Sequence, residues 1–240
     1  HYFGLIGLIS SMHLLGRKKE LHIYAHEELE EIVNLQLKAS KTELNYPLFF
    51  HPLPENESLI ILEDENIRVS NIILDHSIKC CGFLFEEKKS PRKILPDELE
   101  KYNIPNTKIN GLKNGADWIN DNGEVVTNNL LTKPNNSPYK YAYCSDTRFN
   151  NKIIKQIKEV DLLYHEATFM HDLIDRAEQT GHSTTLQAAQ IASQANVKKL
   201  LIGHFSQRYK DLNDLLIQTK KGFSNVTLSY AGLVIDFQDI

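Results

Sequence analysis

The segment YAYCSDTRFNNKIIKQIKEVDLLYHEAT, residues 141–168, decides the fold. Two apolar runs typical of strands, 141–144 and 160–164, lie on either side of a run with helical spacing at 150–159. The same alternation continues to the C-terminus. We expect helices at 170–179, 184–195 and 211–222, a strand at 197–204, and two short strands in the tail at 225–237. Strands that alternate with helices predict a mixed α/β architecture.

The N-terminal third predicts further strands with interposed helices. Residues 2–15 are apolar nearly all round, which favours a buried helix. This run is shorter than a membrane span, and it lacks the basic flank and cleavage site of a signal peptide. After it we expect a strand at 21–24, a helix at 26–38, two extended runs within 46–63, and strands at 67–76 and 79–87.

Composition narrows the class of protein. The chain has 240 residues, 41% of them hydrophobic and 24% charged, which is ordinary for a globular domain. Its formal net charge of −4 gives no global sign of a nucleic-acid binder, so that role would need a local basic patch. Three cysteines without framework spacing indicate a reducing, cytoplasmic compartment.

Residues 88–138 form a local exception. They are polar, rich in Asn, Lys, Gly and Pro, and too long for a passive connection in a compact domain. The first half, 88–113, has seven Lys or Arg against three Asp or Glu. We therefore expect an inserted, flexible arm or an active-site flap. A solvated loop is the plainer alternative.

Ionisable residues follow or end four of the predicted strands: His76, Asp146, the pair His165–Glu166, and His204. Ligand and metal sites collect at strand ends in layered α/β folds. Any one of these residues could simply be a hydrogen-bonded side chain entering a loop. Together, neutral imidazoles and a carboxylate are what a Zn²⁺ or Mn²⁺ site requires.

The segment GHSTTLQAAQ, residues 181–190, predicts a helix start. Thr184 with Gln187 matches a capping box. His182 then lies just before the helix N-terminus, where developing negative charge is favoured, so it could donate a proton to a leaving oxygen.

Four motifs in this order, YCSDTR, YHEATF, GHSTT and IGHFSQRY, together with DHSIKCCGFLFEE upstream of the insertion, resemble the ribonuclease Z family over essentially the whole chain. That family consists of tRNA 3′-processing endonucleases of the metallo-β-lactamase fold. The resemblance implies an αββα sandwich over residues 1–240 with an inserted exosite arm at 88–138. It also implies that the chain is incomplete at its N-terminus. His1 would be the last residue of a His-x-His-x-Asp-His motif that lies mostly upstream.

The resemblance assigns metal ligands residue by residue. His76 would bind one of two Zn²⁺ or Mn²⁺ ions, Asp146 would bridge both, and His1 and His204 would bind the second. A hydroxide held by the metals would attack the phosphodiester of precursor tRNA. His182 would protonate the departing 3′ oxygen, and Glu166 would orient its ring. The products would be a tRNA with a 3′-hydroxyl and a trailer with a 5′-phosphate.

The resemblance also implies how RNA is held. Ser206 and Arg208 would grip a substrate phosphate. The arm would clamp the tRNA elbow in a homodimer. Its phosphate contacts would come from the basic residues Lys88, Lys89, Arg92, Lys93, Lys101, Lys108 and Lys113.

Two alternatives stay open at this point. The chain could be another metallo-β-lactamase-fold hydrolase that acts on a small phosphodiester or ester, with the same metal residues but no need for the basic arm. Because half of the expected metal ligands would lie upstream of His1, it could also be a metal-poor, inactive fragment that still binds tRNA.

Overall fold

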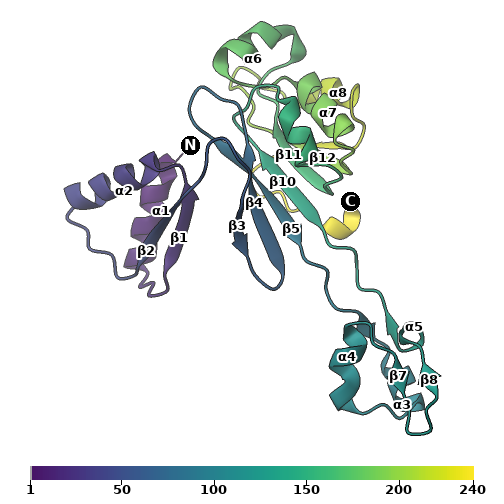
Figure 1. Ribbon diagram of the computed structural model, residues 1–240. Helices are drawn as coiled ribbons and strands as arrows, with labels where there is room; N and C mark the ends of the chain where they lie inside the picture. Colours follow the sequence, from purple (N-terminus) through teal and green to yellow (C-terminus); the bar gives the residue numbers. More distant parts are fainter. Residues whose placement is uncertain (1) are drawn as a thin grey trace. The chain divides into compact units, whose positions relative to one another are not determined.

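The computed structural model describes residues 2–240, and its centre is a seven-stranded sheet in the order β13-β12-β11-β10-β5-β4-β3 (Figure 1). The strands are β3 (Ile60–Glu63), β4 (Ile67–Ile73), β5 (Cys81–Glu87), β10 (Lys140–Cys144), β11 (Leu162–Glu166), β12 (Lys199–Gly203) and β13 (Val226–Leu228). The strands expected at 141–144, 160–164 and 197–204 are confirmed.

Strands β10 to β13 are parallel, and this arrangement creates the edge that matters for function. Cys144 pairs with His165, which pairs in turn with Ile202. Because parallel strands end at the same edge, the residues that follow β10, β11 and β12 emerge side by side.

Helices α6 (Ile174–Thr180), α7 (Thr185–Gln194) and α8 (Asn213–Lys220) follow the strands, and α7 packs on β11 and β12. The core between them is apolar and includes the fully buried Leu163, Ile191 and Ile202. The predicted capping box is confirmed, because Thr184 and Gln187 each accept a bond from the other's backbone N–H. The first turn of α7 therefore has a defined start, directly after His182.

The N-terminal elements are α1 (Phe3–Leu14), β1 (Leu21–Ala25), α2 (Glu28–Ala39) and β2 (Leu48–Pro52), with β1 and β2 parallel. Their small core contains Ile9, Val33 and Tyr46. The expectation that the first helix is buried was wrong. Ile9 is its only buried residue, and Phe3 and Leu14 are about four-fifths exposed. Only one side of α1 packs against other described residues, so its apolar composition overstates its burial.

Residues 63–68 and 86–140 make a second compact unit. Its elements are β6 (Lys93–Ile94), α3 (Pro96–Lys101), η1 (Asn106–Lys108), α4 (Ile109–Lys113), β7 (Trp118–Ile119), β8 (Val125–Val126), α5 (Asn128–Leu131) and β9 (Thr132–Lys133). Ile104, Leu112 and Leu131 form its buried core. The predicted arm, 88–138, therefore folds around a small apolar core although its composition is polar.

Two further expectations were wrong in detail. The helix expected at 150–159 is a 3-10 helix, η2 (Asn151–Lys155), and the left-handed backbone of Glu159 reverses the chain before β11. The tail contains one strand in place of two, because a turn at Gly232, with φ +86°, is followed by the short η4 (Phe237–Asp239). No helix among residues 2–240 is long and apolar enough to cross a membrane.

Candidate active site

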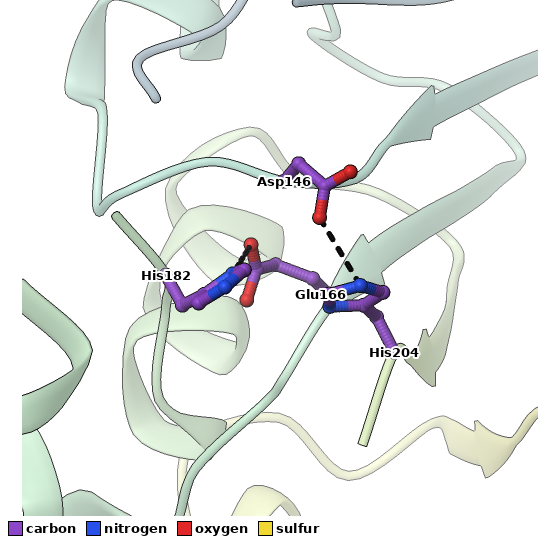
Figure 2. A group of neighbouring side chains, drawn as sticks. All are labelled: Asp146, Glu166, His182 and His204. Carbon is purple, nitrogen blue, oxygen red and sulfur yellow. Dashed lines mark hydrogen bonds and ion pairs between the residues drawn. The ribbon is translucent and has the colours of Figure 1, made fainter. Parts of the chain in front are cut away.

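Four side chains meet at the carboxyl edge of the sheet: Asp146, Glu166, His182 and His204 (Figure 2). Each offers one ligand atom, and these atoms all lie within 4.8 Å of one another. Asp146 follows β10 and His204 follows β12, and both have left-handed backbones, with φ of +58° and +57°. A positive φ costs energy for a residue with a side chain, and such strain clusters at functional sites. Asp146 and His204 thus share a rare backbone conformation at the point where each strand ends.

His204 presents one ring nitrogen to the centre of this cluster. Its Nδ1 lies 3.0 Å from the hydroxyl of Thr168, and its Nε2 lies 3.1 Å from Asp146 Oδ1. The Thr168 hydroxyl donates to Glu166 Oε2 at 2.6 Å, so it can accept the proton of His204 Nδ1. Nε2 is then the ring nitrogen that faces Asp146 and the one that would bind a metal ion.

Glu166 is fully buried, and all its acceptor positions are used. Oε1 accepts from the Thr147 backbone N–H at 2.7 Å and from His182 Nδ1 at 2.9 Å. Oε2 accepts from the Thr168 hydroxyl and from the Ser183 backbone N–H at 3.0 Å. Since a carboxylate has about four lone-pair positions, none remains for a metal ion. Glu166 is therefore suited to holding its neighbours in place.

These bonds also keep Glu166 ionised. Burial by itself would raise the pKa of Glu166, but hydrogen bonds from His182, Thr168 and Ser183 outweigh it and the pKa is lowered. The hydrogen bond with Glu166 raises the pKa of His182 above its ordinary value, although the burial of His182 acts in the opposite direction. The Glu166 carboxylate thus favours a protonated His182.

The His182 ring neighbours the rings of His76 and His204, the two predicted ligand histidines among the described residues. Its ring centroid is 5.1 Å from that of His76 and 5.2 Å from that of His204. Because Nδ1 is bonded to Glu166, Nε2 is the ring nitrogen left for a substrate. Its position just before α7 is as the sequence predicted.

His76 comes from the loop after β4 and is not one of these four residues, but its ring lies beside that of His182 and is bonded to Gly181. His76 Nδ1 lies 2.8 Å from the Gly181 carbonyl oxygen, so Nε2 is available as a ligand. Gly181 has φ +78°, and a Cβ atom there would come within 2.5 Å of His76 Nδ1. Only glycine fits at this position without moving the histidine.

The described residues suit a divalent metal ion. Asp146 supplies a carboxylate, and His76 and His204 supply imidazoles whose other nitrogens are already bonded to protein groups. This donor set is typical of Zn²⁺ and Mn²⁺. Glu166 and His182 lie in the same cluster, where the ion pair between them occupies His182 Nδ1 and leaves only Nε2 of that ring available to another group. The remaining predicted ligand, His1, lies outside the described residues.

Ser206 and Arg208 occupy the loop after β12. Arg208 Nε donates to the Ser206 hydroxyl at 3.2 Å, and its guanidinium lies over the Phe169 ring, 5.0 Å from the centroid. Phe169 contacts His182 in turn, with ring centroids 6.2 Å apart. The guanidinium is therefore held on the aromatic side chain that adjoins the candidate acid.

The basic residues of the inserted unit differ in how they are used. Lys88 pairs with Glu63 at 2.8 Å and Lys101 with Glu98 at 2.9 Å. Arg92 donates to the Thr132 hydroxyl at 2.6 Å and to Asn129 Oδ1 at 2.8 Å. Within residues 2–240, the other four make no ion pair and are exposed: Lys89, Lys93, Lys108 and Lys113.

Sequence reasoning missed four residues that organise the site. Thr147, Thr168 and Ser183 hold Glu166, and Arg148 bonds to the loop before His76. All four lie within three residues of a predicted site residue. Only Thr168 bonds Glu166 through its hydroxyl, and this hydroxyl two residues after the buried acid was the available signal, whereas Thr147 and Ser183 use their backbone N–H groups.

No family model matches the chain. The ribonuclease Z of Bacteroides fragilis is 45% identical over 235 residues, which cover 98% of this chain and 77% of that protein. The ribonuclease Z of Bacteroides thetaiotaomicron is 46% identical over 235 residues, covering 98% and 74%.

Solved structures agree on the fold. The crystal structure of the short form of human tRNase Z aligns with a TM-score of 0.63 at 23% identity, covering 99% of this chain and 74% of that one. A metallo-β-lactamase-fold protein from Bacillus subtilis aligns with a TM-score of 0.61 at 16% identity, covering 98% and 73%. The fold predicted from the resemblance is confirmed. The chain therefore belongs to the ribonuclease Z family, the tRNA 3′-processing endoribonucleases of the metallo-β-lactamase fold.

Proposed function

We propose that this chain hydrolyses the phosphodiester bond that joins the 3′ trailer to a precursor tRNA, leaving a tRNA 3′-hydroxyl and a trailer 5′-phosphate. The observation that supports this most strongly is the His182–Glu166 ion pair, 2.9 Å long, beside the carboxylate and imidazoles of Asp146, His204 and His76. A proton donor next to a metal centre is the arrangement that hydrolysis of a phosphodiester requires, and the ion pair supports the proposal for this reason.

His182 acts as general acid in this proposal. Its Nε2 gives a proton to the departing 3′ oxygen, which is a poor leaving group as an alkoxide. Glu166 holds Nδ1–H and stabilises the protonated ring, as its effect on the pKa of His182 supports. Glu166 itself stays anionic because its four donors remain in place.

The predicted metal ligands keep their assigned roles in this proposal: His76 would hold one ion, His204 and His1 would hold the second, and Asp146 would be a ligand of both. A bound Zn²⁺ or Mn²⁺ pair would lower the pKa of a water molecule and neutralise negative charge on the phosphate. The Gly181 carbonyl accepts from His76 Nδ1 and the Thr168 hydroxyl from His204 Nδ1, and these bonds would orient the two rings as ligands.

Substrate RNA is held by two groups of residues in this proposal. Arg208, supported on Phe169, and Ser206 grip a phosphate near the reacting bond. The inserted unit contacts tRNA through its basic residues, with Lys89, Lys93, Lys108 and Lys113 as its exposed cations. By analogy with the family, we also propose that the inserted unit contacts the tRNA elbow and that the protein acts as a homodimer in the cytoplasm. Sedimentation of the protein with and without tRNA would test the dimer.

The experiment that tests the function compares two substrates. We expect a labelled precursor tRNA to be cut at a single position, giving a trailer that carries a 5′-phosphate. A chelator should abolish the reaction, and zinc or manganese should restore it. Bis(p-nitrophenyl) phosphate is the second substrate. Turnover of that small ester with no cleavage of precursor tRNA would contradict the proposal.

A further inference from the structure

Arg148, in the loop after β10, bonds to the loop after β4 and to helix α6, and the proposed mechanism gives it no task. Its Nη1 donates to Asp75 Oδ1 at 3.0 Å, and its Nε donates to the backbone carbonyl of Glu178 at 3.1 Å. Its backbone N–H also donates to the Asp75 carbonyl at 2.7 Å. One side chain thus bonds the loop after β4 to helix α6 from a position two residues after Asp146.

Both partners of Arg148 adjoin functional residues. Asp75 directly precedes His76, and Glu178 lies four residues before His182. The same two segments meet again where His76 Nδ1 bonds to the Gly181 carbonyl. The His76 and His182 rings, with centroids 5.1 Å apart, are therefore held by two separate links between the segments that carry them.

We propose that Arg148 is a positioning residue that sets the separation of His76 and His182 by bonding Asp75 to Glu178. This inference rests on the proposed function, because it concerns how the candidate ligand and the candidate acid are aligned. Arg148 touches neither substrate nor metal in this role.

The chemistry of arginine suits this task better than that of lysine. Nη1 and Nε donate in two directions within one rigid plane, and the backbone carbonyl of Glu178 is a fixed acceptor. The carboxylates of Asp75 and Glu178 are 58% and 67% exposed, so the ion pairs themselves add little stability. Loss of the contacts should change geometry more than the free energy of unfolding.

Substrate binding is the competing role for an arginine near this site. The Arg148 side chain is only 25% exposed, and three of its contacts are to protein groups. An arginine that grips RNA would raise KM when removed. A positioning arginine would lower kcat, and it would weaken metal binding by about 10- to 100-fold through the displaced ligand.

The test replaces Arg148 by Gln and by Lys, and Asp75 by Asn, in the full chain. Arg176→Ala is the matched control, because Arg176 is an exposed arginine on the same helix, α6. Cleavage of precursor tRNA gives kcat and KM. Competition with a chromogenic chelator gives zinc affinity, and hydrogen exchange by mass spectrometry reports on the amides of Gly181 and His182. Far-UV circular dichroism checks the fold of each variant.

We expect Arg148→Gln to lower kcat by about 10- to 100-fold with KM within about twofold, to weaken zinc binding about tenfold, and to speed exchange at Gly181 and His182. Arg148→Lys should recover part of each effect, and Asp75→Asn should reproduce part of each. A raised KM with unchanged kcat and unchanged exchange would overturn the inference. If the wild type cleaves no precursor tRNA, the proposed function fails by itself, and zinc affinity with exchange still decides the role of Arg148.

Discussion

The carboxyl edge of the large sheet and the inserted unit use polar side chains in opposite ways. At the edge, Glu166 is fully buried and accepts four hydrogen bonds, one of them from His182. In the inserted unit, Lys89, Lys93 and Lys108 are exposed. The first region holds each group in a single geometry, whereas the second offers positive charge with freedom to adjust.

This difference follows from the task proposed for each region. Proton transfer requires its atoms to be placed within a hydrogen-bond length, and buried, saturated groups achieve that. Attraction of an RNA backbone requires charge more than geometry, because counterion release depends on the number of phosphates contacted. The edge should therefore respond sharply to single substitutions, and the inserted unit should respond gradually.

The largest effect is expected from His182→Ala. Loss of the general acid should lower kcat for precursor tRNA by on the order of 10²–10⁴. The metal content should hardly change, because His182 is the proposed acid and is not a proposed ligand. Single-turnover kinetics and elemental analysis measure both quantities. A variant that lost its metal would show that His182 is a ligand, and the assignment would have to change.

An intermediate effect is expected from Leu112→Ala in the core of the inserted unit. Leu112 is 1% exposed, so the cavity should cost about 2–5 kcal/mol and disorder this unit. Turnover of bis(p-nitrophenyl) phosphate should persist, while KM for precursor tRNA should rise. Leu130→Ala, at a leucine of the same unit that is 53% exposed, is the control and should change neither. Equal loss of both activities would show that the two regions are not separable.

The smallest effects are expected from single lysines. Lys108→Gln or Lys113→Gln should each weaken tRNA binding a few-fold and reduce the slope of log affinity against log salt by about 1. Lys101→Gln should matter less, because Lys101 already pairs with Glu98. Filter binding over a range of salt concentrations measures the slopes. If the slope in each of the three variants equals that of the wild type, these lysines do not contact the RNA.

The local sequence determined the parallel strands β10 to β12, the start of α7 and the residue types at the strand ends. The apolar runs before Asp146, Glu166 and His204 are strands, and the capping box after His182 is present. These features depend on side chains a few residues apart, so a linear pattern contains them. Composition was a weaker guide, since it predicted a buried α1 and gave no sign of the core around Leu112.

Only the tertiary structure decided which of these residues act together. His76 bonds to the carbonyl of Gly181, 105 residues away in sequence, and Arg148 bonds to Asp75, 73 residues away. Glu166 collects donors from three loops. Such contacts depend on strand order and on where each loop leaves the sheet, and these are set by packing of the whole core. No short stretch of sequence contains that information.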